Sequence, residues 1–255
     1  LGGYGAALGS ILLGVSDAFI LVLLGVMASS CVAFLLGFMM ARYRGIFFAL
    51  LNLAFSMLFF GLLVNSASLG STDGFSIPAP SYLGYVPSVA ETRVTFVLYS
   101  MICILTYLSA IAVHRYLSST MGYIGDAIRE NEVRIEYLGA SVRQSIMIKY
   151  VISAVLAGMG GALTVLLIGH VTPEDTVYWT RSGEFVFVAI LSGTGHVVAP
   201  FLGSAVFELV RTYALQYAPD VWQMLLGATL LLVIMFLPSG IWSLIQKVVR
   251  PRLET

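Results

Sequence analysis

Apolar residues are grouped along this chain in long blocks that short polar segments separate. Continuous apolar runs cover residues 18–40, 46–66, 94–113 and 150–168. Each run is close to the roughly 20 residues that a helix needs to cross a bilayer core about 30 Å thick. Apolar and polar residues do not alternate with a period of two, as they would in a transmembrane barrel. The pattern therefore predicts an all-α, polytopic helical membrane protein.

Three further apolar segments are shorter or interrupted. Residues 1–15 are small and apolar, which predicts the end of a helix or a re-entrant piece, and residues 221–237 predict a last span. Residues 184–217 are broken in the middle by SGTGHVVAP. At 1.5 Å per residue, 184–192 would cover only about 14 Å. Two predictions follow from this length: a broken or re-entrant segment with irregular backbone at membrane depth, or a plain helical hairpin.

Composition supports a membrane protein and offers little other chemistry. Only 26 of the 255 residues are charged and the mean hydropathy is +0.95, so a soluble domain would lack its polar shell. The net charge is zero, and no basic patch indicates a nucleic-acid partner. Cys31 and Cys103 lie in apolar runs and indicate neither a disulfide nor a metal site. The chain starts at Leu1 without a basic leader, so we expect no signal peptide and a truncated N-terminus.

Basic residues predict which loops face the cytoplasm, because Lys and Arg gather on that side of a membrane. The segment 114–149 contains five basic residues and the C-terminal tail contains three. The loops 67–92 and 169–183 contain one between them, Arg181. We therefore expect 67–92 and 169–183 to be external, and 114–149 and the C-terminus to be cytoplasmic.

Eight of the 26 charged residues gather between Asp126 and Lys149. Apolar residues recur there at about 3.5-residue spacing, which predicts one amphipathic helix over 125–146. On that helix Glu130 and Arg134 would pair at i,i+4, and Gly139 would permit a bend. The helix would either lie solvated on the cytoplasmic face or dock on a protein partner through complementary charges.

The charged segment also resembles a known family. AIRENEVRIEYLG (127–139) is similar to the cytoplasmic loop of the branched-chain amino acid ABC importer permeases of the LivM type. In that family the loop couples the permease to its ATPase. The resemblance implies that the coupling residues of this chain are Arg129, Glu130, Asn131, Glu132, Arg134, Glu136, Leu138 and Gly139.

Further motifs extend the resemblance over nearly the whole chain. The matching stretches, in the order that the family has them, are RYRGIFFALLNLAFSMLF (42–59), LGSTDGFSIP (69–78), SAVLAGMGGAL (153–163), HVTPEDT (170–176) and LSGTGHVVAPFLGS (191–204). Asn52 stands where the family has Thr, and Ser192 replaces a glycine. These differences leave the transported solute open between branched-chain amino acids, urea or amides, and aromatic acids.

The resemblance implies a single permease domain over 1–255 with the helical fold of ABC importers. Such a permease would lie in the bacterial inner membrane with a second, LivH-type permease, two cytoplasmic ATPase subunits and a soluble substrate-binding protein. The chain itself would be no enzyme and would need no cofactor, because ATP and Mg would belong to the ATPases. The zinc-protease motif H-E-x-x-H and the nucleotide-binding motif G-x-x-x-x-G-K-[ST] are both absent from the sequence.

The matching motifs also suggest a substrate path and a docking site for the binding protein. The candidate path residues are Asn52, Ser56, Ser192, Thr194 and His196, and the candidate docking residues are Asp73, Gly74, Glu174 and Asp175. Asn52 and Ser56 share one helix face, where they would line a polar path or form hydrogen bonds with a neighbouring helix.

Two remaining patterns lie inside predicted spans. Ala154, Gly158 and Ala162 form a ridge of small residues, which predicts close helix packing. Glu208 and Arg211 are spaced to neutralise each other at i,i+3. Charges within a membrane often serve function, so an ion-coupled secondary transporter that uses Glu208 stays an alternative, as does a membrane scaffold without transport activity.

Overall fold

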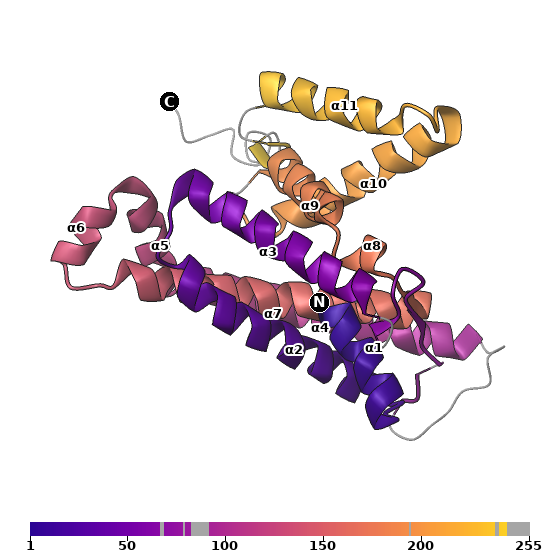
Figure 1. Ribbon diagram of the computed structural model, residues 1–255. Helices are drawn as coiled ribbons and strands as arrows, with labels where there is room; N and C mark the ends of the chain where they lie inside the picture. Colours follow the sequence, from indigo (N-terminus) through magenta and orange to yellow (C-terminus); the bar gives the residue numbers. More distant parts are fainter. Residues whose placement is uncertain (67–68, 79, 83–91, 194, 238–239, 244–255) are drawn as a thin grey trace. The chain divides into compact units, whose positions relative to one another are not determined.

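Helices make up almost all of the structure, a computed structural model that describes residues 1–66, 69–78, 80–82, 92–193, 195–237 and 240–243 (Figure 1). The helices are α1 (Gly2–Leu13), α2 (Ala18–Met40), α3 (Gly45–Asn65), α4 (Thr92–Leu117), α5 (Thr120–Glu130), α6 (Glu132–Tyr137), α7 (Val142–Ile168), α8 (Pro173–Thr176), α9 (Trp179–Ser192), α10 (Ala199–Tyr217) and α11 (Trp222–Phe236). The two short strands are β1 (Phe75–Ser76) and β2 (His170–Val171). The predicted all-α class is therefore confirmed.

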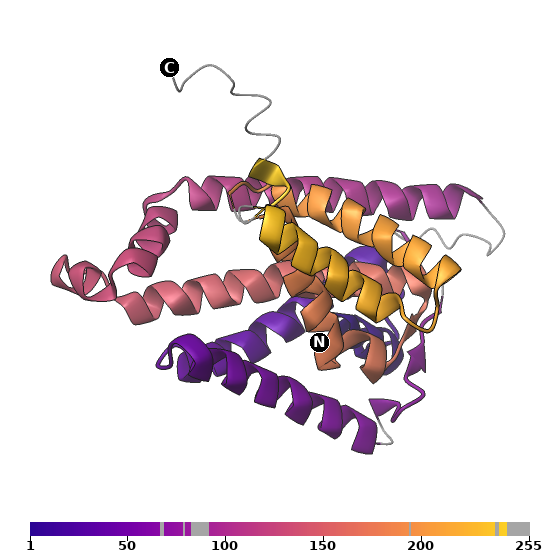
Figure 2. The same ribbon diagram turned by 90° about the horizontal axis from the view of Figure 1, so that it is seen from above.

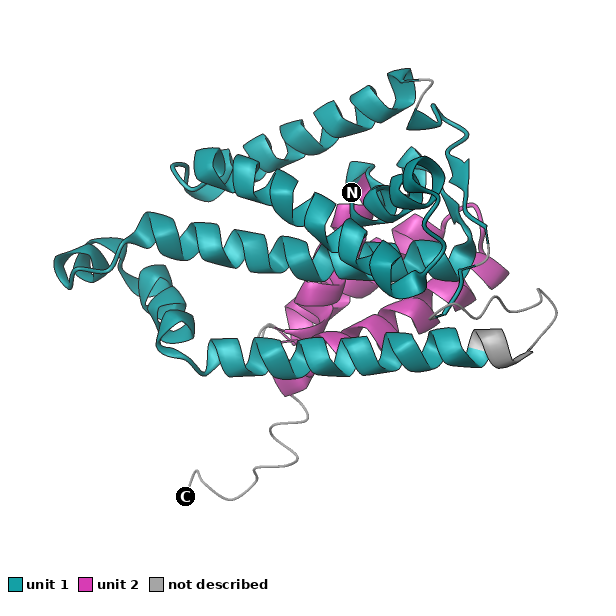
Figure 3. Cartoon of the chain, turned by 90° about the horizontal axis from the view of Figure 1, so that it is seen from below, with its two compact units in different colours: residues 1–179 teal, residues 180–255 magenta. Residues whose placement is uncertain are grey.

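Residues 1–179 and 180–255 form two compact units (Figure 3). Unit 1 contains α1 to α8, and unit 2 contains nearly all of α9 together with α10 and α11. The single permease domain over 1–255 stays a prediction.

Four helices of unit 1 are long and apolar enough to cross a membrane: α2, α3, the segment Phe96–Leu117 of α4, and α7. They confirm the four predicted apolar runs. Asp17 caps α2 by accepting a hydrogen bond from the Phe19 backbone N–H at 3.0 Å, which fixes the predicted start of that helix. The helix α7 begins eight residues earlier than the apolar run at 150, because Val142 and Ser145 are already buried against the bundle.

The helices α1, α2 and α7 form a three-helix core in which glycines bring the backbones together. A Cβ atom on Gly2 would collide with the Gly158 backbone, and one on Gly25 would lie 2.5 Å from the Gly2 carbonyl oxygen. A Cβ atom on Gly158 would collide with the Ser29 hydroxyl. The views in Figures 1 and 2 show α2 and α7 side by side. The close packing predicted around Gly158 and Ala162 is confirmed.

The predicted external loops meet in a small antiparallel sheet at one end of the three-helix core. Phe75 of β1 pairs with Val171 of β2, and the Ser76 hydroxyl lies 3.2 Å from Nδ1 of His170. Beneath the sheet, Tyr4 of α1 packs edge-on against Phe75. Segments about a hundred residues apart in the sequence therefore lie together, as two loops on one side of a membrane would.

Gly74 is the tightest point of this sheet, and its replacement by alanine tests the pairing. Its φ is +72°, and a Cβ atom would collide with the Val171 carbonyl oxygen. We expect Gly74→Ala to raise hydrogen–deuterium exchange across 70–78 and 169–177. The matched control is Gly14→Ala, because Gly14 has a φ of +63° but no atom within 4 Å of its Cβ position. If Gly14→Ala raised exchange across 70–78 and 169–177 as much as Gly74→Ala does, backbone strain alone, about 1–2 kcal/mol, would account for the effect.

Unit 2 confirms the predicted break in segment 184–217. The helix α9 ends at Ser192 and α10 begins at Ala199, so part of the stretch expected to be irregular is the first turn of a helix. Gly203 of α10 lies against Ser192, because a Cβ atom there would be 2.5 Å from the Ser192 Cβ. The helix α11 confirms the apolar segment predicted over 221–237, and at 15 residues it is shorter than the four long helices. The last membrane span over 221–237 and the re-entrant or hairpin path of 184–217 stay predictions.

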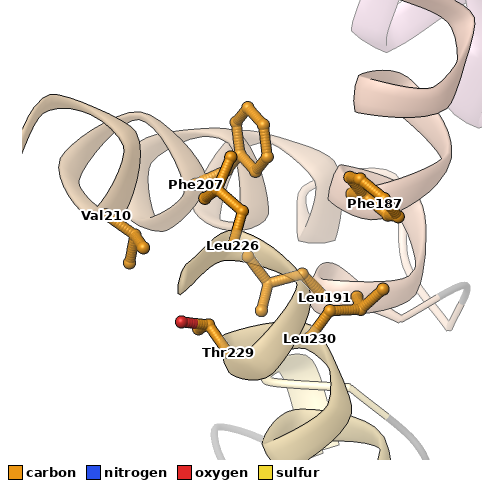
Figure 4. A pocket seen from close by; sticks show the side chains of 7 residues that line it. All are labelled: Phe187, Leu191, Phe207, Val210, Leu226, Thr229 and Leu230. Carbon is orange, nitrogen blue, oxygen red and sulfur yellow. The ribbon is translucent and has the colours of Figure 1, made fainter. Parts of the chain in front are cut away.

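The core of unit 2 is apolar and nearly full. A pocket of about 10 Å³ lies between α9, α10 and α11, and Figure 4 shows the side chains that line it. Its lining residues are Phe187, Leu191, Phe207, Val210, Leu226, Thr229 and Leu230. This volume is close to the least that a single water molecule needs, so the pocket is a packing defect rather than a solute site.

Candidate functional site

The charged loop, residues 118–141 between α4 and α7, extends past the adjoining ends of those helices (Figure 2). The single amphipathic helix predicted over 125–146 is wrong, because the loop contains two short helices, α5 and α6. Asn131 is extended between them, and its side chain accepts a hydrogen bond from the Arg134 backbone N–H at 3.1 Å. Asn is a favoured N-cap, so it starts a new helix instead of continuing the old one. Gly139, with φ of +86°, confirms the predicted bend.

The break changes which charges of the loop interact. Glu130 and Arg134 form no ion pair within the described part of the chain, because they lie on different helices. Seven of the eight predicted coupling residues are exposed, namely Arg129, Glu130, Asn131, Arg134, Glu136, Leu138 and Gly139. The loop therefore presents charges of both signs that a partner could pair.

Glu132, the eighth predicted coupling residue, forms an ion pair with another residue of the same chain. The Nε atom of Arg44 donates to both carboxylate oxygens of Glu132, at 3.1 and 3.0 Å. No role for Arg44 was predicted from the sequence. The available signal was its place in the family-like stretch 42–59, which does not indicate a partner 88 positions away.

An exposed apolar tip adds to the charges of the loop. Val133 and Tyr137 of α6 are 60% and 88% exposed, and Leu138 is 76% exposed. Contact with lipid would explain exposed apolar side chains on the four long apolar helices. Val133, Tyr137 and Leu138 lie outside those helices. Grouped exposed apolar residues next to charges are typical of protein interfaces. Sequence reasoning identified Leu138 by resemblance but missed Val133 and Tyr137.

The candidate path residues on α3 form hydrogen bonds with neighbouring segments. The Tyr150 hydroxyl of α7 donates to Oδ1 of Asn52 at 3.2 Å, and the Ser56 hydroxyl donates to the Val177 carbonyl at 3.0 Å. The helix-pairing alternative therefore describes their contacts in this structure. Asn52 is exposed and Ser56 is partly buried, and their role in a solute path stays a prediction.

The candidate path residues of unit 2 surround the break between α9 and α10. Ser192 is buried, and its hydroxyl lies 3.1 Å from the Ala189 carbonyl oxygen, to which it donates. His196 is exposed and stacks on Trp242, with 4.8 Å between the ring centres. Thr194 lies outside the described residues. Each candidate is therefore placed within its own unit, and its path role stays a prediction.

The candidate docking residues lie at the small sheet. Asp73, Glu174 and Asp175 are exposed, and Gly74 forms the tight turn between Asp73 and β1. Asp175 also accepts a hydrogen bond from the Thr172 hydroxyl at 2.9 Å, which steadies the short helix α8. The pairing of β1 with β2 thus brings these carboxylates to one end of unit 1.

Glu208 and Arg211 of α10 form the predicted i,i+3 pair, with 3.7 Å between carboxylate and guanidinium. The Arg211 guanidinium also lies over the Trp222 ring at 5.9 Å from its centre. No group of three His, Cys, Asp or Glu residues that could hold a metal ion is found where the structure describes the chain.

Comparison with known proteins agrees with the architecture of long apolar helices and a charged loop. The family described as "Branched-chain amino acid transport system / permease component" matches residues 1–234. The high-affinity branched-chain amino acid transport system permease protein LivM of Escherichia coli K12 is 29% identical over 254 residues, covering 90% of this chain. The LivM protein of Salmonella typhimurium LT2 is 28% identical over 252 residues, covering 89% of this chain.

The chain spans 57% of the length of each of these two relatives. No solved structure matches it. Because the family match covers most of the chain, the chain belongs to the branched-chain amino acid transport system permease family.

Proposed function

We propose that this protein is a transmembrane permease subunit of an ATP-driven importer that carries branched-chain amino acids delivered by a binding protein. It would act with a second, LivH-type permease and two cytoplasmic ATPases that bind ATP and Mg. The observation that carries the proposal is the charged loop, which presents exposed charges of both signs beside the apolar tip of α6. Such a surface suits a groove on a soluble protein partner.

The opposite end of unit 1 suits a different partner. The sheet formed by β1 and β2 presents Asp73, Glu174 and Asp175 at an exposed rim. A binding protein with basic residues at its rim would find complementary charges there. This placement accords with the external assignment of loops 67–92 and 169–183 in a bacterial inner membrane, with the C-terminus in the cytoplasm.

A secondary transporter is the weaker candidate. It would need an intramembrane acid free to exchange an ion, and the carboxylate of Glu208 already lies 3.7 Å from the Arg211 guanidinium. The ABC importer therefore accounts better for the charged loop and for the Glu208–Arg211 pair.

The decisive test is reconstitution with the ATPases and the second permease encoded beside this chain. We expect the four components to co-purify and, in proteoliposomes with binding protein, to accumulate labelled leucine in proportion to ATP hydrolysed. Urea and phenylalanine, supplied with the same complex, test the alternative solutes. Uptake of leucine by the permease without ATPases would instead support the ion-coupled alternative.

A further inference from the structure

Arg44 joins the charged loop to the end of α2 and to the turn that follows it. Besides the two bonds from Nε to Glu132, at 3.1 and 3.0 Å, its Nη1 donates to the carbonyl oxygens of Ala41 and Tyr43, at 2.6 and 3.0 Å. Glu132 is the first residue of α6, and Ala41 is the C-cap of α2. One guanidinium therefore fixes the start of α6 against the C-cap of α2 and the turn that follows it.

A second contact fixes the other side of the loop to the same helix end. Arg143, in the first turn of α7, donates from Nη2 to the Phe38 carbonyl oxygen at 3.1 Å. Its guanidinium also lies 4.6 Å from the centre of the Phe38 ring. Phe38 belongs to the last turn of α2. The start of α6 and the start of α7 are thus both fastened to the end of α2.

These contacts fix the position of the charged loop more than they stabilise the fold. The side chains of Arg44 and Glu132 are 36% and 42% exposed, and ion pairs with such access to water contribute little to folding. The single Nε–H of Arg44 nevertheless points between the two carboxylate oxygens of Glu132, and a hydrogen bond between two charged groups is stronger than one between neutral groups. The contacts also connect the charged loop to the three-helix core, because α2 packs against α1 and α7 through close contacts at glycines. A displacement of α6 would therefore reach the three-helix core directly.

We propose that the Arg44–Glu132 ion pair, supported by Arg143 on Phe38, is the mechanical link through which the charged loop moves the three-helix core during ATP-driven transport. Arg44 and Glu132 are then positioning residues, and the exposed charges of the loop are left for the ATPase. This inference rests on the proposed function for its role in transport. The rigid link itself is a property of this chain alone.

Charge reversal of one partner and then of both tests the link. We expect Arg44→Glu and Glu132→Arg each to keep the ATPase subunits bound but to lower leucine taken up per ATP hydrolysed by about tenfold, within the range seen for residues between coupled sites. The double variant Arg44→Glu with Glu132→Arg should restore part of the ratio, because the ion pair forms again while the bonds from position 44 to the Ala41 and Tyr43 carbonyls are lost. Arg42→Glu is the matched control, because Arg42 is an exposed residue of the same turn and forms no ion pair among the described residues.

A distance measurement tests the same link without partners. Spin labels at Leu35 of α2 and Tyr137 of α6, which are 67% and 88% exposed, would be placed in a background with Cys31 and Cys103 replaced by Ser. We expect a narrow distance distribution in this background, a broad one in either single reversal, and a narrow one in the double variant. If a reversal prevents folding, Arg44→Gln replaces it and should broaden the distribution in the same direction.

The outcomes separate the link from the proposed function. Distributions that stay narrow in the single variants, or a double variant that restores neither readout, would overturn the link. Loss of the ATPases from the Glu132→Arg complex would overturn it as well, since Glu132 would then contact the partner directly. A complex without ATPases in the absence of any substitution would sink the proposed function, while the distances would still decide whether the link is rigid.

Discussion

Replacing Gly158 by valine is expected to prevent the three-helix core from closing. A Cβ atom at this position would collide with the Ser29 hydroxyl of α2, and the Gly2 backbone of α1 lies against the same glycine. The Ser29 hydroxyl can rotate away, but the Ser29 Cβ at 2.7 Å and the Gly2 backbone cannot move without displacing a helix. We expect overpacking to cost about 3 kcal/mol of the free energy of unfolding, which would lower the Tm by roughly 10 °C for a chain of this size. Thermal unfolding in detergent, followed by far-ultraviolet circular dichroism of the helices, measures the shift.

Gly160→Val is the matched control for this prediction. Gly160 lies two residues further along α7, and its Cβ position has no atom within 4 Å. Both variants put the same β-branched side chain into the same helix, so differences in helix propensity cancel. A Tm of Gly158→Val as high as that of Gly160→Val would show that the glycine contacts do not hold the core together.

Reversing Glu130 and Arg134 together is expected to release the ATPase subunits. Both side chains are exposed on the charged loop and form no ion pair within the described residues, so a partner can bind them both. In Glu130→Arg with Arg134→Glu, each charge would meet its own sign on the partner. Breaking charge pairs that are buried at an interface costs about 2–5 kcal/mol. Co-purification from detergent should then recover the permease without ATPase.

The control for this reversal keeps the net charge and alters a pair elsewhere. Arg181 and Glu184 of α9 already pair with each other at 3.1 Å, three residues apart. Arg181→Glu with Glu184→Arg reverses that pair and leaves the charged loop untouched. ATPase subunits that stay bound to both double variants would argue against the loop as the docking surface.

Hydropathy predicted the long helices of this chain well, because an apolar run needs no distant partner to become a membrane helix. Residues 18–40 were predicted as a span, and α2 covers the same residues. The break in 184–217 was also predictable, since glycine and proline interrupt helices locally. The resemblance then identified a family that the comparisons show.

The details of the site were harder to predict, because they depend on contacts between distant residues. Asn131 is a favoured N-cap, but the 3.5-residue apolar spacing on both sides of it favoured a continuous helix. The link from Arg44 to Glu132 joins residues 88 positions apart, and no local pattern indicates it. The pairing of Phe75 with Val171 also joins residues far apart in the sequence, and no local pattern indicates it either.

The glycine contacts of the three-helix core also set an order of events during synthesis. Gly2 and Gly25 are made before Gly158, which is made only after more than a hundred further residues have been added. At about 5–20 residues per second, α1 and α2 would wait several seconds with their small-residue faces uncovered. During that interval lipid or an insertion factor would have to shield those faces, and other helices with small residues could compete for them. Misassembly of this protein is therefore expected to begin before α7 enters the membrane.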